Sequence, residues 1–555
     1  MNWKRFVASH KEQLVTVAVL LVTCLVSFGA LDPTIISSDD WSSFVAKYAF
    51  GELQPLNLAD RRPLTYTFYY GLSLLFGVHF AYIYFVNLLI LFTSALLLYA
   101  ILKRVHPGSG WLAALVALTT LVYPVDYTRT WVIMMYIRFC WLLSLGAIWL
   151  LLGYMETGHP WSYLLAMLGI VVPLGAYEGQ LGVTLLAGIL IALLPARVPA
   201  RRRWVLLGSL LAICISFLAW RITLQPRFFD VQDAYVDAFQ LNPALLVERY
   251  REGLQAFLSG WLPPLLAQLK LEGINPWPWL SVYAAIALLA VAWVRRSRAS
   301  GPPPSSHQKA SWLRTYALAL LVGAAFWGAG YVPIIGLYGP SLAGNASRVN
   351  AFAVTGASLA LVAVVAMVAG MVARSTRETP VLSTLMLLPF LLAGIFVQTR
   401  VNAERAAAWD TQKAIWNGVL ETIPDLRDGG AVVIIIPGYT QMRPYQYLPF
   451  LSGWEVEAGA QVLYDNPQVG GYYYYRLQEP DLLFSQNGFR QIPTDRTVPY
   501  RRLVFVEYDP GGGSVRLVTD LETAIPLLFQ AKNYHPLEHI GSKPPAAPLR
   551  WLVGK

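Results

Sequence analysis

Charged residues are scarce in this chain, and their scarcity excludes most soluble folds. Among its 555 residues, 13% are charged and 56% are hydrophobic, whereas soluble domains carry about 25% charged residues. The mean hydropathy is accordingly positive, at +0.48. The composition is that of an integral membrane protein, for which we expect a mainly α-helical fold.

Cysteines and nucleotide-binding motifs are also missing or few. The three cysteines, Cys24, Cys140 and Cys214, all fall inside apolar runs, so no disulfide framework or cysteine metal site is predicted. The chain contains no Gly-rich phosphate loop and no dinucleotide fingerprint. The segments predicted to be cytoplasmic are short, so we expect no nucleotide-binding domain.

The net charge of +10 does not indicate nucleic-acid binding, because the basic residues lie in short segments between apolar runs. This distribution is the positive-inside pattern of membrane proteins. An N-terminus in the cytoplasm places these clusters inside, and we therefore predict a protein integral to the cytoplasmic (inner) membrane. The first apolar run, 14–31, has roughly 18 residues, more than the h-region of a signal peptide, and is predicted to be a retained span.

Eleven apolar runs are long enough to cross or nearly cross a bilayer. They predict a polytopic transmembrane helical bundle of about eleven spans over residues 1–400. The runs are 14–31, 80–102, 111–124, 131–153, 161–176, 179–194, 204–221, 277–294, 312–331, 351–373 and 381–398.

The first external loop, 32–79, holds two segments that suit helices lying in the membrane interface. Trp41 to Phe50 is short and amphipathic, and Leu64 to Val78 is rich in aromatic residues that favour headgroup level. Helical spacing of apolar residues predicts a further interfacial helix in the loop 223–276.

Soluble composition begins near Asn402 and predicts a C-terminal extracytoplasmic α/β domain over residues 401–555. A helical stretch from Ala403 to Leu420 precedes two strand candidates, Ala431–Ile436 and Leu503–Tyr508. We expect this domain to bind or orient an acceptor and to carry no catalytic residue. Its four consecutive tyrosines, 472–475, either expose rings that stack on sugars or form an aromatic edge of the domain core.

Two adjacent aspartates, Asp39 and Asp40, directly follow the first span. They are either helix-capping residues of a solvated loop or a carboxylate base at the membrane surface. Further polar residues converge on the same leaflet, and arginines among them suit a lipid phosphate. An alternative for two of them, Arg138 and Glu178, is that they neutralise one another or a backbone carbonyl. The set comprises Arg61, Arg62, Asp126, Arg129, Arg138, Tyr177, Glu178, Gln180, Arg221, Arg348 and Asn350.

This arrangement resembles the GT-C glycosyltransferases. The shared features are a first span, an acidic pair early in the first external loop, interfacial helices in that loop, many further spans and a C-terminal extracytoplasmic domain. The superfamily includes protein O-mannosyltransferases, the aminoarabinose transferases of lipid A and related bacterial polyprenol-dependent transferases. The resemblance implies a membrane glycosyltransferase that takes its sugar from a polyprenyl-phosphate donor and passes it, with inversion, to a glycan, lipid or protein acceptor.

The resemblance also implies roles for individual residues. Asp40 is the first choice for the base that activates the acceptor, and Asp39 is the second. The Arg62-Pro63-Leu64 element and the loop 344–350 with Arg348 resemble elements near the donor phosphate in such proteins. Four arginines are accordingly expected at that phosphate: Arg62, Arg348, Arg129 and Arg138. Substrate positioning falls to Glu178, Tyr177 and Arg61. A divalent metal ion could assist, and no other cofactor is expected.

Two rival functions remain open at this point. A polymerase or ligase of lipid-linked glycans would share the fold and the donor chemistry, and the sequence does not separate it from a transferase. A lipid or glycolipid transporter would also need many spans with intramembrane charges. The one-sided polar set, the lack of an obvious internal repeat and the soluble outer domain disfavour the transporter.

Overall fold

The computed structural model describes most of the chain. The described residues are 3–29, 34–36, 38–58, 62–193, 199–228, 242–261, 265–266, 306–336, 338–342, 344–373, 375, 378–436, 447–475, 482–491, 496–525, 530–541 and 547–554.

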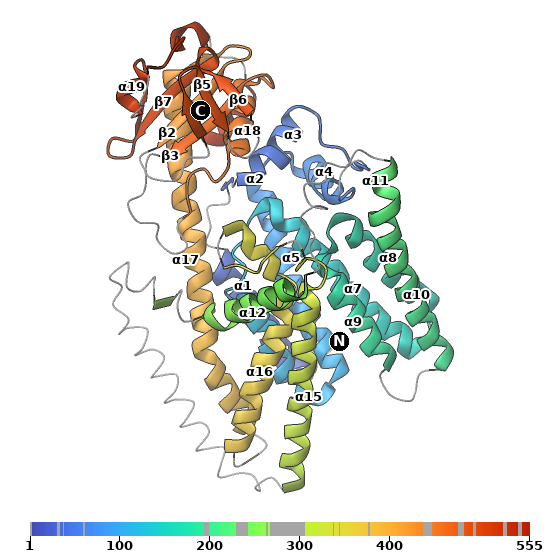
Figure 1. Ribbon diagram of the computed structural model, residues 1–555. Helices are drawn as coiled ribbons and strands as arrows, with labels where there is room; N and C mark the ends of the chain where they lie inside the picture. The colour runs from blue at the N-terminus through green and yellow to red at the C-terminus, as the bar shows by residue number, and fades with distance from the viewer. Residues whose placement is uncertain are drawn as a thin grey trace.

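Apolar helices dominate the first four hundred residues, as the composition predicts (Figure 1). Six helical segments are long and apolar enough to cross a membrane, and four shorter apolar segments accompany them. These ten correspond to ten of the eleven predicted spans, and the remaining run, 277–294, lies outside the described residues. The main helices are α1 (Trp3–Phe28), α5 (Phe80–Val105), α6 (Gly110–Val122), α7 (Met135–Thr157), α8 (Pro160–Ala176), α9 (Leu181–Leu193), α10 (Ala200–Ala219), α15 (Ser306–Tyr331), α16 (Ala353–Val372) and α17 (Glu378–Thr422).

Two of the basic residues assigned to the inner face, Arg104 and Arg202, lie near each other at one end of the bundle. Arg104, at the end of α5, pairs with Glu156 at the end of α7 at 2.6 Å. Arg202, in the first turn of α10, donates to the carbonyl oxygen of Met155 at 3.2 Å. Their clustering is what the positive-inside pattern predicts for one membrane face.

The first external loop contains short helices, as its composition predicts. Ser38–Asp40 (α2) continues through a π-helical turn, Trp41–Val45, into α3 (Ala46–Ala49). The aromatic segment forms α4 (Thr65–Phe76). The second long loop contains α12 (Pro243–Ser259), which crosses the ends of α15 and α16 in Figure 1.

Helix α17 is one continuous helix of 45 residues. The sequence predicted a span over 381–398 and a separate helical stretch over 403–420, but no break separates them. The helix runs from the bundle into the C-terminal domain (Figure 1). The predicted domain boundary near residue 400 therefore falls inside a helix rather than in a linker.

The C-terminal domain is built on a four-stranded sheet with the order β3-β2-β7-β8. The buried strand β2 (Ala431–Ile436) pairs in parallel with β3 (Gly470–Tyr475) and β7 (Leu503–Asp509), and β8 (Ser514–Leu517) is antiparallel to β7. Both strand candidates are thus confirmed, and the all-apolar run of β2 suits a strand covered on both faces. A three-stranded antiparallel sheet adjoins it, with β4 (Leu482–Ser485), β5 (Gly488–Gln491) and β6 (Arg496–Pro499).

The four consecutive tyrosines lie in β3 and serve the domain core. Tyr472 packs edge-on to Phe489 with 4.9 Å between ring centroids, and Tyr474 packs edge-on to Phe484 with 5.2 Å between ring centroids. Tyr473 and Tyr475 contact each other at 5.1 Å. None of the four is exposed, so the aromatic-core alternative holds and an open stacking platform does not.

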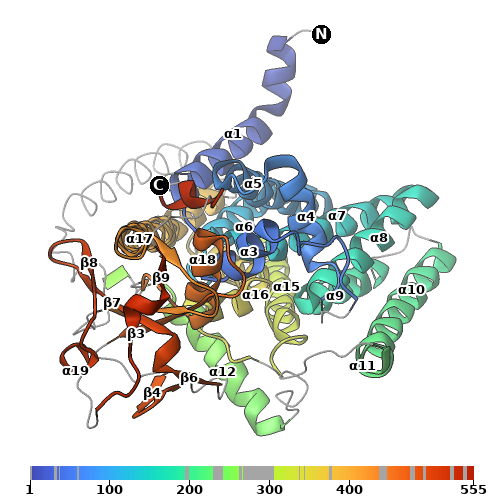
Figure 2. The same cartoon turned by 90° about the horizontal axis from the view of Figure 1, so that it is seen from above.

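Helix α18 (Gly453–Tyr464) brings the C-terminal domain onto the first external loop. It lies against α2, the π-helical turn and α3, and the view from above shows the two regions side by side (Figure 2). The acidic pair is therefore placed between the membrane bundle and the outer domain.

Candidate functional site

Asp39 and Asp40 occupy different environments although they are adjacent. Asp40 is fully buried, and its Oδ1 accepts a 2.6 Å hydrogen bond from the backbone N–H of Ile133. Asp39 is partly exposed, and its Oδ1 accepts the indole N–H of Trp454 at 2.9 Å. Because α2 turns the two side chains in different directions, Asp40 faces the bundle and Asp39 faces the outer domain.

Arg405 on α17 lies close enough to Asp40 to interact with it electrostatically. It is buried, stacks over the Trp131 ring at 5.5 Å and donates to the Thr130 hydroxyl. The Thr130 hydroxyl in turn donates to Asn402 Oδ1 at 2.8 Å. These contacts join α17 to the external turn that precedes α7 and hold the guanidinium beside the acidic pair.

Glu455, the third residue of α18, adds a third carboxyl group from the outer domain. It is buried, and its oxygens accept the N–H of Leu451 at 2.9 Å and the amide of Gln412 at 2.8 Å. Burial raises the pKa of Glu455 to about 8, and the nearby charges of Asp39 and Asp40 act in the same direction. The carboxyl group is therefore mainly protonated at neutral pH.

A second charged cluster surrounds Glu178, between α8 and α9. Arg62 binds its carboxylate with two hydrogen bonds of 2.9 Å, from Nε and Nη2. Arg221 lies 3.9 Å from the same carboxylate. Burial lowers the pKa of Arg62, but Glu178 and nearby tyrosines more than compensate and raise it well above its ordinary value. This paired geometry fixes the Arg62 guanidinium in one orientation.

A close backbone approach holds Arg62 in this position. Leu64 donates its N–H to the carbonyl oxygen of Gly175 at 2.9 Å, and the Thr65 hydroxyl donates to Ala176 O at 2.9 Å. A Cβ at Gly175 would lie 2.6 Å from the Leu64 side chain. The glycine near the end of α8 therefore lets the first external loop dock directly beside Glu178.

Tyr177 and Tyr136 connect Arg348 to the same cluster. The Arg62 guanidinium lies over the Tyr177 ring at 4.3 Å, and Tyr136 packs edge-on to Tyr177 at 5.8 Å. Arg348 acts electrostatically on both tyrosines and lies over the Tyr338 ring at 5.7 Å. The structure thus brings together four of the predicted residues, namely Arg62, Arg348, Tyr177 and Glu178.

An apolar groove of about 550 Å³ ends at this cluster. Its walls come from α8, α10 and the first external loop, and Arg221 lines its polar end. Several apolar side chains on α8 and α10 are exposed, among them Leu168, Val171 and Ile215. The groove therefore combines an apolar wall with one guanidinium group, that of Arg221.

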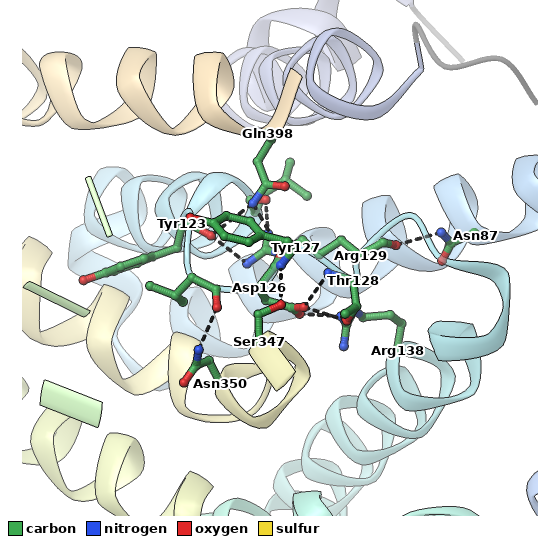
Figure 3. Close-up of polar contacts among 12 residues, drawn as sticks. Asn87, Tyr123, Asp126, Tyr127, Thr128, Arg129, Arg138, Ser347, Asn350 and Gln398 are labelled. Carbon is green, nitrogen blue, oxygen red and sulfur yellow. Dashed lines mark hydrogen bonds and ion pairs between the residues drawn. The ribbon is translucent and has the colours of Figure 1, made fainter. Parts of the chain in front are cut away.

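Arg138 and Arg129 belong to a third network, around the external turn 123–131 (Figure 3). Arg138 pairs with Asp126 and donates to the Thr128 hydroxyl at 3.0 Å. Arg129 donates to the carbonyl oxygens of Leu121 and Tyr123. The suggestion that Arg138 and Glu178 neutralise one another is therefore wrong, because each has a different partner.

The same network fixes the turn to the rest of the bundle (Figure 3). Ser347 accepts the N–H of Tyr127 at 2.9 Å, and Asn350 donates to Val125 O at 2.7 Å. Arg129 donates to backbone carbonyl oxygens. Two nitrogens of Arg138, Nε and Nη1, have no hydrogen-bond partner among the described residues. Whether Arg129 and Arg138 bind a phosphate stays a prediction.

The described residues do not include Arg61 and do not form the metal site that the sequence left open. Arg61 lies outside the described residues. Within the described ranges, no group of three or more His, Cys, Asp or Glu side chains is placed to hold a metal ion.

Sequence reasoning missed Arg405, Gln412 and Glu455. All three lie in segments with ordinary soluble composition, so neither hydropathy nor a motif marks them. Asp39 and Trp454 are 415 residues apart in sequence, and only the tertiary fold places them in contact.

Comparisons with known proteins give structural similarity but no match in sequence. No protein-family model matches the chain, and no curated protein matches its sequence. Among solved structures, the crystal structure of ArnT from Cupriavidus metallidurans in the apo state is similar over 91% of this chain and 94% of that one, with 14% identity and a TM-score of 0.33. Because both values are low, we infer the function from the chain's own side chains.

Proposed function

We propose that this protein is a GT-C-type glycosyltransferase. It transfers a sugar from a polyprenyl-phosphate donor to a hydroxyl group of an extracytoplasmic glycan, lipid or protein, with inversion at the sugar carbon. The donor binds at the Glu178 cluster, and the acceptor is activated at the acidic pair.

The observation that carries this proposal is the apolar groove lined at one point by Arg221, which also lies beside Glu178. An isoprenoid chain has no polar atoms and suits the walls formed by α8 and α10. Its phosphate would reach Arg221 and Arg62, and Arg348 acts on the same tyrosines. A guanidinium matches a phosphate through its planar fork of donors. A lipid with one anionic end is thus the ligand that fits both parts.

The chemical step needs one base and a stabilised leaving group. Asp40 takes the proton from the acceptor hydroxyl as its oxygen attacks the anomeric carbon. The bond from that carbon to the phosphate oxygen breaks on the opposite face, and its electron pair leaves with the polyprenyl phosphate. The arginines balance the added negative charge. Atoms and charge balance without a nucleotide.

The position of Asp40 supports its choice as the base over Asp39. The Ile133 N–H holds one carboxylate oxygen in place, which fixes the direction of the other. Asp39 is partly exposed and bound to Trp454, which suits a residue that fastens the outer domain.

The test is consumption of a defined donor by the purified protein in nanodiscs. Short-chain polyprenyl phosphates that carry different single sugars would be supplied, and release of free polyprenyl phosphate would be followed by mass spectrometry. We expect slow hydrolysis of one donor even without acceptor, with inverted configuration in the product by NMR. Release from none of the donors, by protein that remains folded, would refute the proposal.

A further inference from the structure

A small pocket lies between the segment that precedes α2, the turn that precedes α7, α17 and the outer domain. We call it the hydroxyl pocket, and it is lined by Trp131, Arg405, Trp409, Gln412, Tyr447 and Glu455, with Ile35 and Ile36 at its edge. The space has room for a group about the size of a water molecule. Four separate parts of the chain therefore meet around a space that fits one polar group.

Three hydrogen-bonding groups of this pocket lack partners among the described residues. They are the indole N–H groups of Trp131 and Trp409 and the hydroxyl of Tyr447, all of them buried from solvent. The Trp131 N–H approaches the Tyr447 hydroxyl without forming a well-aligned hydrogen bond. Native proteins rarely leave buried polar groups unpaired, so a cluster of three around one space indicates a missing ligand atom.

The ligand atom must accept hydrogen bonds. Both tryptophans can only donate, and Gln412 already uses its amide N–H groups on Pro449 O and Glu455. Glu455 is mainly protonated at neutral pH, because burial raises its pKa to about 8, so its own proton is available as well. A hydroxyl oxygen, which accepts twice and donates once, satisfies this set better than a carboxylate or an ammonium group.

We propose that the hydroxyl pocket binds a hydroxyl group of a carbohydrate acceptor, with Trp409, Tyr447 and Glu455 as its hydrogen-bonding partners. The inference rests on the proposed function and adds to it the class of acceptor. A neutral carboxyl group avoids repulsion from the two aspartates nearby.

Steady-state kinetics with the full-length protein test the role of individual groups. Glu455→Leu should raise the KM for acceptor about ten- to hundredfold, because it removes a hydrogen-bonding group from a buried site. Trp409→Phe keeps the ring, removes only the N–H and should raise the KM by about five- to tenfold. In both variants, the KM for donor should be unchanged.

Trp416→Phe is the matched control. Trp416 is also on α17, is fully buried and has an indole N–H without a partner among the described residues, yet it does not line the pocket. Its substitution should leave the acceptor KM at the wild-type value. Equal acceptor KM values in wild type, Glu455→Leu and Trp409→Phe would overturn the inference.

A binding measurement separates this inference from the proposed function. Saturation-transfer NMR with a panel of methyl hexosides, on wild-type protein in nanodiscs, requires no turnover. We expect transfer to at least one hexoside, reduced in Glu455→Leu and preserved in Trp416→Phe. No transfer to any hexoside, or equal transfer in Glu455→Leu, would refute the pocket, whereas failure to consume any donor refutes the proposed function alone.

Discussion

The two charged regions of the outer surface differ in the sign of their excess charge. Around Glu178, two guanidinium groups share one carboxylate, and Arg348 lies near enough to act on the same tyrosines. This region holds more positive than negative groups. It adjoins an apolar groove, which is where a lipid phosphate would arrive.

The acidic region has the opposite balance. Three carboxyl groups, those of Asp39, Asp40 and Glu455, interact with one another, and Arg405 interacts with Asp40. The region adjoins the outer domain rather than the groove. An excess of carboxyl groups suits the uptake of a proton, and one of them stays neutral. Under the proposed function, the leaving group belongs to the first region and the attacking group to the second.

Removing the proposed base should have the largest effect. Asp40→Asn keeps the shape of the side chain and should lower the transfer rate by about 10²–10⁴-fold, the usual contribution of a general base. Donor binding should be nearly unchanged. Asp39→Asn, the matched variant one residue away, should have a smaller effect. Normal turnover in purified Asp40→Asn would remove Asp40 from the mechanism.

Removing positive charge from the region around Glu178 should weaken donor binding. Arg348→Ala and Arg62→Ala should each weaken donor binding about ten- to hundredfold, since one charge-assisted hydrogen bond contributes about 1.5–3 kcal/mol. Competition by a non-transferable lipid phosphate measures this. Arg202→Ala, at the inner end of α10, is the control. Equal affinity in all four proteins would leave these arginines with a structural role only.

A pH series sharpens the account of the acidic region. Burial raises the pKa of Glu455 from its ordinary value near 4.5 to about 8, so the folded protein keeps a proton that the unfolded chain releases. Its contribution to stability is complete below pH 4.5 and falls as the pH rises toward 8, by up to about 1.4 kcal/mol per pH unit. Glu455→Gln should flatten this decline in thermal unfolding measured between pH 5 and 8. Parallel curves for both proteins would contradict the assignment.

The smallest effect is expected at the contact between the outer domain and Asp39. Trp454→Phe removes a hydrogen bond from a side chain that is 56% exposed, and such a bond contributes about 1 kcal/mol. Transfer should fall by no more than about fivefold, with donor hydrolysis unchanged. Trp161→Phe, also exposed but on α8, serves as the control. A loss as large as that in Asp40→Asn would show that Asp39 does more than fasten the domain.

Hydropathy and periodicity predicted most of the fold because they are local properties. The spans, the short helices of the first loop, α12 and strands β2 and β7 all follow from runs or spacings within a few turns of chain. The continuity of α17 could not be predicted in this way, because its composition changes near Asn402 while its backbone remains helical. A helix that passes from an apolar to an aqueous environment changes in composition, and in the sequence this change looks like a domain boundary.

The candidate site was predictable only in part. Asp39, Asp40, Arg62 and Glu178 stand out because each is a charged group beside an apolar run. The pairing of Arg62 with Glu178 and of Arg138 with Asp126 has no counterpart in sequence spacing, since ion pairs between helices depend on how the helices pack. The third carboxyl, Glu455, is ordinary in its own segment and becomes unusual only when the outer domain buries it.

The unbroken helix α17 connects the helical bundle to the outer domain and fixes the distance between them. At about 1.5 Å per residue, its 45 residues span about 68 Å. A domain mounted on such a rod has a set height above the bilayer and a set rotation about the rod axis. One residue inserted between Asn402 and Arg405 would rotate the outer domain by about 100° and raise it by about 1.5 Å. If the proposed function is right, the length of this one helix sets the distance from the bilayer at which an acceptor is glycosylated.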